Sequence, residues 1–109
     1  VSCFPEIEKE RGVKIDVKTY NCDIPVRCEK SITDIIEKYS DELGYPYEYL
    51  ISGPYHDSLF VGWFAPVAMI FVPSRNGISH SPDEWTDFED IAAGTDILAH
   101  TLAELADKI

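Results

Sequence analysis

The chain has 109 residues, of which 45% are apolar, and this suits one globular domain with a modest core. Twenty acidic residues against nine basic ones give a net charge of −11. Binding to nucleic acid or to an anionic membrane surface needs a basic face, and the sequence has no basic cluster, so we expect neither partner. No window approaches the roughly 18–20 consecutive apolar residues of a membrane-spanning helix.

The chain has three cysteines, Cys3, Cys22 and Cys28. This small, odd number argues against a disulfide framework. None has a Cys or His neighbour at zinc-site spacing. We therefore expect reduced thiols in a cytoplasmic protein. The chain opens on Val1 without a basic-then-apolar leader. Because Phe4–Gly12 is typical of the end of a helix with a glycine stop, we expect a chain cut from a longer one.

The first strand is predicted at Val13–Val17, where apolar and charged residues alternate. The connector NCDIPVRC, residues 21–28, follows, and a shift in composition near residues 21–27 indicates a domain boundary. A helix is expected to begin at Ser31, with Asp34 as its capping-box partner, and to end at Gly44. Its apolar face has helical spacing and consists of Ile32, Ile35, Ile36, Tyr39 and Leu43.

The second half repeats this alternation. Tyr47–Ile51 is predicted to form a strand, the SGPYHD loop follows, and Asp57 or Ser58 is expected to cap a short apolar segment. Val67–Val72 is apolar on both faces, as buried parallel strands are. The last helix is expected to begin at Thr86, with Glu89 completing a capping box.

The order strand, helix, strand, helix, strand, helix predicts an α/β fold with a mostly parallel sheet and flanking helices. In such sheets ligands bind beyond the carboxyl ends of the strands. The SGPYHD loop follows the second predicted strand, and the loop PSRNGISHSPDE follows the third. Both histidine-bearing loops are therefore expected at one edge of the sheet, which is the reason to consider His56 and His80 together.

His80 is the best candidate for chemistry, since a neutral imidazole is the commonest protein ligand for zinc. Gly77 permits an unusual turn before it, and Glu84 or Asp83 is suitably placed in the sequence to orient the ring. The alternative interpretation is an ordinary solvated loop histidine, and spacing by itself favours that alternative.

Gly53 and His56 form a second candidate, because glycine lets a backbone approach a ligand and an imidazole can donate to a carbonyl oxygen. An ordinary loop histidine is again the alternative. His100 lies in the last predicted helix beside its apolar stripe, where a structural role is expected. For Arg75 a surface arginine is the default, although its guanidinium could also bind a carboxylate.

Residues 69–106 carry a more specific pattern. P-S-x-x-G-x-S-H-x-P-x-E is matched in full from Pro73 to Glu84. The sequence here resembles the zinc-type amidohydrolases that include N-carbamoyl-L-amino-acid hydrolase, allantoate amidohydrolase and beta-ureidopropionase, relatives of aminoacylase and carboxypeptidase G. SGPYHDS stands where that family usually has SGAGHDA, so Pro54 and Tyr55 replace two small residues. The resemblance covers nearly the whole chain but only about the last quarter of a family enzyme.

The resemblance implies an enzyme with two metal ions, zinc or manganese, that activate a water toward an amide or carbamoyl carbon. It assigns His80 as a metal ligand, Glu84 to its second shell, and Gly53 and His56 to substrate binding. It places residues 1–20 at the end of a lid or dimerisation domain and residues 21–109 in the catalytic domain. The other metal ligands, the general base and the substrate-gripping arginine of the family fall outside these residues.

We therefore expect a C-terminal fragment of a hydrolase of linear amides, such as N-carbamoyl amino acids, allantoate or similar ureido acids. The fragment itself is expected to be inactive and to bind metal weakly. Two alternatives stay open: a short non-catalytic binding or assembly module derived from the family, and one chain of a split hydrolase. Because half a sheet leaves an open edge, self-association or a homodimer is also expected.

Overall fold

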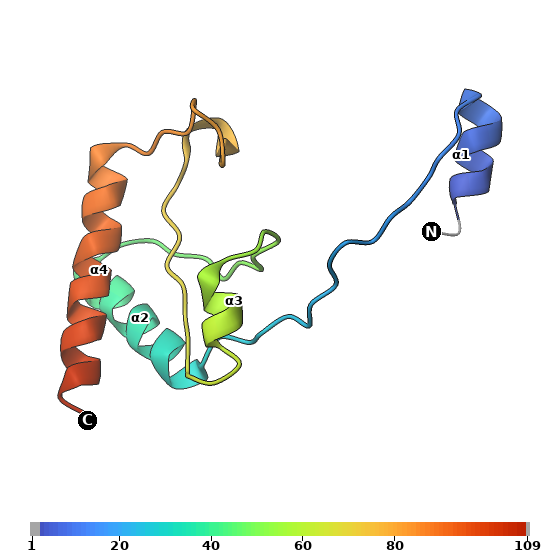
Figure 1. Ribbon diagram of the computed structural model, residues 1–109. Helices are drawn as coiled ribbons and strands as arrows, with labels where there is room; N and C mark the ends of the chain where they lie inside the picture. The colour runs from blue at the N-terminus through green and yellow to red at the C-terminus, as the bar shows by residue number, and fades with distance from the viewer. Residues whose placement is uncertain (1–2, 109) are drawn as a thin grey trace.

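The computed structural model describes residues 3–108; residues 1, 2 and 109, the ends of the two predicted domains, lie outside the described residues. Its helices are α1 (Phe4–Arg11), α2 (Lys30–Leu43), α3 (Asp57–Val61) and α4 (Phe88–Ala106), with a 3-10 turn, η1 (Arg75–Gly77). Figure 1 shows α2, α3 and α4 close together, and α1 set apart at the end of an extended linker. The whole measures 59 × 33 × 22 Å. Among residues 3–108, no helix has both the length and the apolar character required to span a membrane.

Two predicted helix ends are confirmed. Gly12 follows α1 with φ 64°, and Gly44 follows α2 with φ 75°, both in the left-handed region that favours glycine. The backbone N–H of Gly12 donates to the carbonyl of Glu8 at 2.9 Å, and that of Tyr45 donates to the carbonyl of Ser40 at 2.9 Å. These bonds satisfy carbonyls that each helix end would otherwise leave free.

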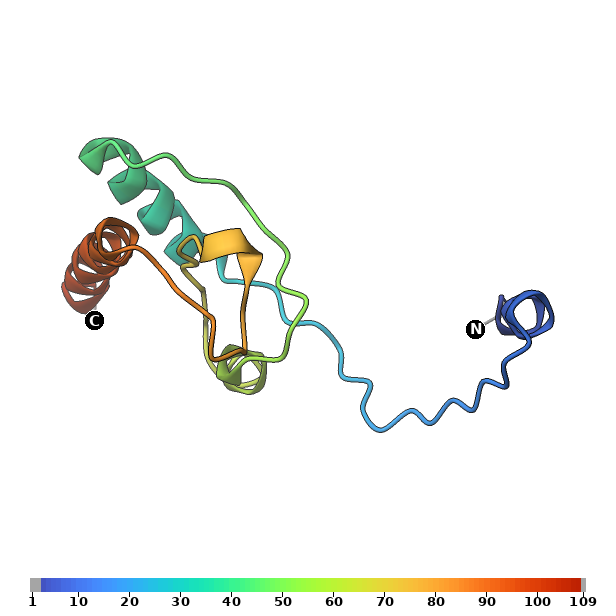
Figure 2. The same cartoon turned by 90° about the horizontal axis from the view of Figure 1, so that it is seen from above.

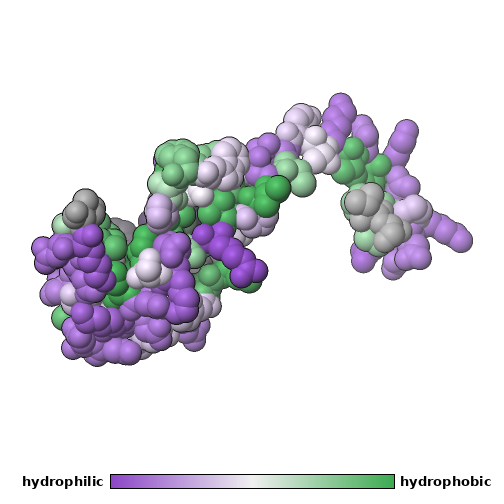
Figure 3. Space-filling view, turned by 90° about the horizontal axis from the view of Figure 1, so that it is seen from below, coloured by the Kyte–Doolittle hydropathy of each residue, from purple (hydrophilic) through white to green (hydrophobic). Residues whose placement is uncertain are grey.

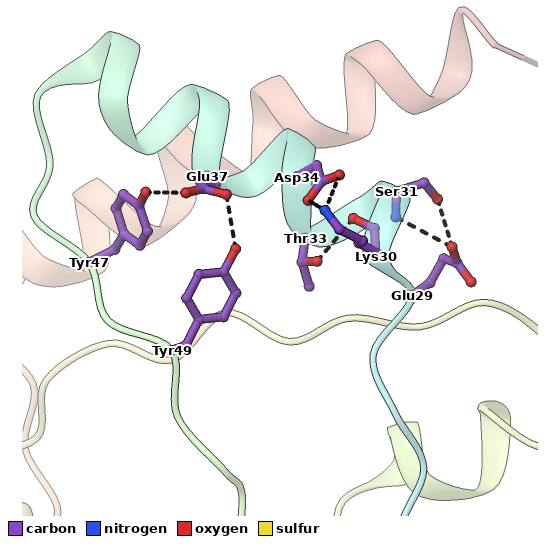
Figure 4. Close-up of polar contacts among 8 residues, drawn as sticks. All are labelled: Glu29, Lys30, Ser31, Thr33, Asp34, Glu37, Tyr47 and Tyr49. Carbon is purple, nitrogen blue, oxygen red and sulfur yellow. Dashed lines mark hydrogen bonds and ion pairs between the residues drawn. The ribbon is translucent and has the colours of Figure 1, made fainter.

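The predicted start of α2 is wrong, because Glu29 and not Ser31 caps it (Figure 4). The Glu29 carboxylate accepts from the Ser31 backbone N–H at 3.3 Å. Asp34, the predicted capping-box partner, instead pairs with Lys30 one turn away, at 2.6 Å. An ion pair at i,i+4 offers that carboxylate a charged partner, whereas the capping box offers only a backbone N–H.

The predicted start of α4 at Thr86 is also wrong. The helix begins at Phe88, and Asp87 stands at the N-cap without a side-chain capping bond. The Asp87 carboxylate is taken by the Arg75 guanidinium at 3.0 Å and by the Trp85 indole N–H at 3.1 Å. These two bonds engage the Asp87 carboxylate, so the loop before the helix, and not the first turn of the helix, holds this side chain.

The predicted parallel sheet is not confirmed. Residues 13–17, 47–51 and 67–72 run extended, but no strand is formed anywhere in residues 3–108. An apolar pattern with period two favours an extended backbone, whereas a strand also requires hydrogen bonds to a neighbouring strand. The predicted helices are therefore present as α2 and α4, whereas the hydrogen-bonded strands of the predicted sheet are not formed within residues 3–108.

The core lies between α2 and α4, which pack against each other (Figure 2). Ile35 of α2 and Ile97 of α4 are the buried apolar residues of the described chain, at 5% and 7% exposure. Lys38 reaches across to Glu104 of α4 at 2.8 Å. A second ion pair joins Lys108 to Glu104, also at 2.8 Å. These two cations, Lys108 foremost, lower the pKa of the Glu104 carboxyl to about 2.

Much apolar surface stays exposed in this arrangement. Figure 3 shows hydrophobic surface interleaved with hydrophilic surface on one face of the molecule. Large side chains that are about half exposed or more occur on the helices and on the extended segments alike, among them Leu102, Phe88, Leu50 and Ile51. Exposed apolar area on this scale is typical of interaction surfaces rather than of a finished monomer.

Candidate functional site

The loop that carries His80, residues 74–87, is closed at its base. The Arg75 backbone N–H donates to the Trp85 carbonyl at 2.8 Å. Within the loop, η1 turns through Asn76 and Gly77, whose φ angles of 56° and 67° both lie in the left-handed region. Asparagine tolerates this region better than most residues, and glycine enters it freely. The Asn-Gly pair therefore permits the tight turn that brings the chain back toward Trp85.

Side chains brace the same loop. Arg75 forms an ion pair with Asp87 at 3.0 Å, and its guanidinium lies 5.5 Å from the centre of the Trp85 ring. The Trp85 indole donates to the same carboxylate at 3.1 Å. Three side chains that start 2 to 12 positions apart thus hold both ends of the loop, and Arg75 has a structural role at the surface.

His80 is exposed and has φ 55°, so it too lies in the left-handed region. Its backbone N–H donates to the Glu84 carboxylate at 2.9 Å, and the Glu84 backbone N–H donates to the Ser81 carbonyl at 3.0 Å. Glu84 therefore contacts the main chain of His80 and fixes its unusual backbone angle. The residue is exposed to solvent, so the imidazole is accessible from outside this loop.

His56 stands at the N-cap of α3 in an extended conformation. Its ring meets Phe71 edge-on, with 5.8 Å between the ring centres. Its Nε2 is buried and has no hydrogen-bond partner among the described residues. Gly53, three residues earlier, is exposed, and an added Cβ would meet nothing within 4 Å. The loop thus offers an open backbone at Gly53 and one unused ring nitrogen at His56.

Three tyrosines, Tyr45, Tyr47 and Tyr49, hold the extended segment that leads into this loop; we call them the tyrosine anchors. The hydroxyls of Tyr47 and Tyr49 donate to the two oxygens of Glu37 on α2, at 2.6 and 3.0 Å (Figure 4). The hydroxyl of Tyr45 donates to Asp96 on α4 at 3.1 Å. Because side chains alternate along an extended backbone, residues two apart share one face, and that face is pinned to both helices.

The carboxylates of Glu37 and Asp96 raise the pKa of the tyrosine anchors. The hydrogen bond to the Glu37 carboxylate raises the pKa of Tyr47 to about 12, because the neighbouring negative charge disfavours the phenolate. The pKa of Tyr49 is raised for the same reason, and that of Tyr45 is raised by Asp96. The phenols therefore stay protonated, and remain donors, over the whole ordinary pH range.

The sequence patterns did not predict this anchoring. The available signal was the i, i+2, i+4 spacing of three hydroxyl-bearing residues beside two acidic helices. A further long-range contact joins the Tyr55 hydroxyl to the backbone N–H of Asp23, at 3.4 Å. Tyr55 therefore connects the His56 loop to the connector that follows the predicted domain boundary.

Both histidine loops lie on the side of the molecule to which the N-terminal end of α3 points (Figure 1). No hydrogen bond or ring contact joins His56 to His80 in the described part of the chain. Within residues 3–108, no group of three or more His, Cys, Asp or Glu side chains is placed to hold a metal ion. His100 has the expected structural environment, with Nδ1 2.8 Å from the Asp96 carbonyl and its ring against Tyr39.

The family model of peptidase family M20/M25/M40 matches residues 4–104. The chain is 40% identical over 100 residues to an N-carbamoyl-L-amino acid amidohydrolase of Geobacillus stearothermophilus, covering 92% of this chain and 24% of that protein. It is 40% identical over 102 residues to a ureidoglycolate hydrolase of Oryza sativa subsp. japonica, covering 93% of this chain and 21% of the relative. The chain thus spans about a quarter of the length of the curated relatives it matches.

A solved structure has the same backbone course. The crystal structure of AtUAH in complex with glyoxylate superposes with a TM-score of 0.76 at 38% sequence identity, over 93% of this chain and 24% of that one. The agreement includes the region in which helices α2 and α4 and the two histidine loops lie, since nearly all of the chain is covered. The family match, the sequence identities and this superposition together establish that the chain belongs to peptidase family M20/M25/M40.

Proposed function

We propose that this chain forms part of a metal-dependent hydrolase that cleaves a linear C–N bond in a small ureido or carbamoyl acid. The observation that carries the proposal is the loop of residues 74–87, in which local hydrogen bonds present a solvent-exposed imidazole. The names of the relatives support the substrate class, because they act on N-carbamoyl amino acids and ureidoglycolate. The residues of this chain contribute to such a site without completing it.

His80 is proposed as one metal ligand, for zinc or manganese. The described residues do not make a complete site, since catalytic zinc takes about three protein ligands and this loop offers one. When bound, the metal would supply an activated water and polarise the scissile carbonyl. The work of this chain is to hold the His80 backbone in the left-handed conformation, which the Glu84 carboxylate stabilises from the N–H side.

Gly53 and His56 are proposed to contact the substrate. The unused Nε2 of His56 supports this, because a buried polar atom without a partner has hydrogen-bonding capacity to spare. Since that nitrogen is closed off from solvent beside Phe71, a substrate reaches it only when neighbouring side chains move. Tyr55, next to His56, is proposed to narrow this end of the pocket relative to relatives with glycine there.

The domain division is also a proposal. Residues 1–20 are assigned to the end of a lid or dimerisation domain, and residues 21–109 to the catalytic domain. The separation of α1 from the other helices in Figure 1 supports it. The reach of Tyr55 to Asp23 supports it further, since that contact ties the start of the second unit to the His56 loop.

A chimaera tests the function. The matching quarter of the Geobacillus stearothermophilus amidohydrolase is replaced by this chain, and hydrolysis of N-carbamoyl amino acids is measured with zinc or manganese. We expect the chimaera to hydrolyse the substrate and the 109-residue chain by itself to show no activity. His80→Ala should lower both metal content and kcat, and His56→Ala should lower kcat/KM with metal content unchanged.

His100→Ala is the matched control. The His100 ring contacts only α2 and α4, which we call the helix layer, so this substitution should leave metal content and kcat unchanged. A chimaera that folds and binds metal but loses nothing on His80→Ala would contradict the ligand assignment. Hydrolysis by the isolated chain would contradict the conclusion that the site is completed from outside these residues.

A further inference from the structure

The connector, residues 21–28, passes close to α3 before the chain enters α2 (Figure 1). Before the start of α3, the Tyr55 hydroxyl accepts from the Asp23 backbone N–H at 3.4 Å. Beyond the end of α3, the Val67 carbonyl accepts from the backbone N–H of Glu29, which follows the connector, at 2.7 Å. Hydrogen bonds therefore attach this stretch of chain to the residues on both sides of α3.

Gly62, the C-cap of α3, lies against the connector between these two bonds. Its φ of −65° and ψ of −10° are ordinary helical angles, so the backbone does not require glycine at this position. The space around it does, because a Cβ added at Gly62 would overlap Val26 Cγ1 and would lie 3.0 Å from Val67 Cγ2. The absence of a side chain at position 62 therefore allows Val26 of the connector to pack directly on the end of α3.

The short length of α3 makes such contacts important. Its five residues, Asp57–Val61, include no buried side chain. An isolated helix of fewer than roughly 12 residues is marginal in water, so contacts with neighbouring segments must fix where this one lies. Besides the connector, one such contact is the hydrogen bond from the Ser58 hydroxyl to Met69 Sδ at 2.8 Å. The position of α3 is therefore set by the segments around it.

His56 depends on α3 in turn. It is the N-cap of the helix, and its carbonyl accepts from the Leu59 backbone N–H at 3.0 Å. Its ring lies edge-on to Phe71, and its buried Nε2 has no hydrogen-bond partner among residues 3–108. The ring is therefore oriented by the backbone of α3 and by Phe71 rather than by a hydrogen bond at Nε2.

We propose that Val26 and Gly62 are positioning residues for His56: their contact holds α3 against the connector and so sets the place of the His56 ring. Because the connector lies at the predicted boundary between the two domains, a displacement of the connector is expected to move this ring. The inference rests on the proposed function, in which His56 contacts a small ureido or carbamoyl acid.

The first measurement is NMR spectroscopy of the 109-residue chain. In Gly62→Ala the new methyl group displaces the connector from α3, which should shift the ring resonances of His56. Amide hydrogen exchange at Leu59 should become about tenfold faster as the short helix loosens. Helical circular dichroism should be kept, since alanine favours helical angles more than glycine does. The resonances of His80 should stay unchanged.

Two double variants distinguish the proposed contact from local damage to α3. Val26→Ala removes Cγ1, the atom that the new methyl group would overlap, so Val26→Ala combined with Gly62→Ala should restore most of the His56 resonances and of the slow exchange at Leu59. Ile24→Ala is the matched control. Ile24 lies in the same connector but is 81% exposed, so Ile24→Ala combined with Gly62→Ala should restore neither.

The second measurement is the kinetics of the chimaera with the Geobacillus stearothermophilus amidohydrolase. Gly62→Ala should raise KM about tenfold with metal content unchanged, because a group that contacts the substrate is displaced. Adding Val26→Ala should bring KM back toward its original value. A role in stability only would instead lower the fraction of folded enzyme, and thus kcat, at an unchanged KM.

Several results would overturn the proposal: unchanged His56 resonances in Gly62→Ala, no restoration by Val26→Ala, or equal restoration by Ile24→Ala. A lower kcat at unchanged KM would assign Gly62 a structural role only. The NMR measurements need no substrate. If they give the expected shifts and the chimaera does not hydrolyse N-carbamoyl amino acids, the positioning of His56 by the connector stands and the proposed function falls.

Discussion

The two histidine loops are held in different ways. The His80 loop, residues 74–87, is closed by contacts among its own residues, such as the Arg75–Asp87 ion pair and the Glu84 carboxylate on the His80 backbone. The segment that leads to His56 has few contacts of its own. The tyrosine anchors attach it to α2 and α4, with Tyr45 and its partner Asp96 separated by 51 positions.

The contacts indicate that the His56 loop, and not the His80 loop, depends on the packing of α2 and α4. A loop folded by short-range bonds should keep its shape whenever its own residues are intact. A loop suspended from two helices should lose its position when those helices loosen. The proposed metal ligand and the proposed substrate-binding histidine should therefore respond to different substitutions.

The largest effect is expected for Ile97→Ala in the helix layer. Ile97 is 7% exposed, and its truncation should cost about 2–5 kcal/mol of unfolding free energy by leaving a cavity between α2 and α4. Denaturant unfolding measures the cost, and NMR measures the two loops. The resonances of His56 should shift while those of His80 stay. Leu98→Ala, 47% exposed, is the control and should cost clearly less; equal costs would contradict this placement of the core.

Gly77→Ala acts on the other loop. Gly77 has φ 67° in open space, so the added methyl group clashes with no neighbour and the cost is backbone strain, about 1–2 kcal/mol. Thermal unfolding and the resonances of His80 should both change. Gly53→Ala is the matched control, because Gly53 also lies in open space but without a positive φ, and its unfolding free energy should barely move. If Gly77→Ala shifted the resonances of His56 and not those of His80, it would contradict the conclusion that the His80 loop is held by its own residues.

Glu37→Ala removes the hydrogen-bond acceptor of two tyrosine anchors, Tyr47 and Tyr49, and leaves the buried residues Ile35 and Ile97 in place. The pKa of Tyr47 should fall from about 12 toward its ordinary value of 10.0, since the carboxylate that disfavours the phenolate is gone. Tyrosinate absorbance during an alkaline titration measures this. Backbone relaxation should report faster motion of residues 45–53 and no change in residues 74–87. Glu48→Ala, in the same segment but between the anchors, should leave the pKa of Tyr47 at about 12.

The smallest effect is the acid response of the helix layer. Lys108 and Lys38 lower the pKa of Glu104 to about 2 from its ordinary 4.5, so the charged form is favoured in the folded chain. A lowered pKa means that this stabilisation is complete above pH 4.5 and is lost as the pH falls toward 2. Lys38→Met should flatten the dependence of the urea midpoint on pH in that window. An unchanged slope would show that this ion pair contributes nothing to the layer.

Much of the structure of α2, α4 and the His80 loop can be predicted from the amino-acid sequence. Glycines at positions 12 and 44 end their helices because each adopts a left-handed φ that other residues avoid. The spacing of Ile32, Ile35 and Ile36 predicts the face of α2 that packs on α4. The turn around Asn76 and Gly77 follows from residue types that accept positive φ. All of these features depend on neighbours within about one or two turns of the chain.

Other features required the folded arrangement. The tyrosine anchors and the bond from the Glu29 N–H to the Val67 carbonyl each join groups that are far apart or on different elements of the chain. The predicted strands illustrate the reason most clearly: side-chain alternation specifies an extended backbone, whereas pairing depends on a partner that the alternation does not name. Local backbone preference is encoded residue by residue, but the pairing of polar groups is decided only when tertiary structure brings them within reach.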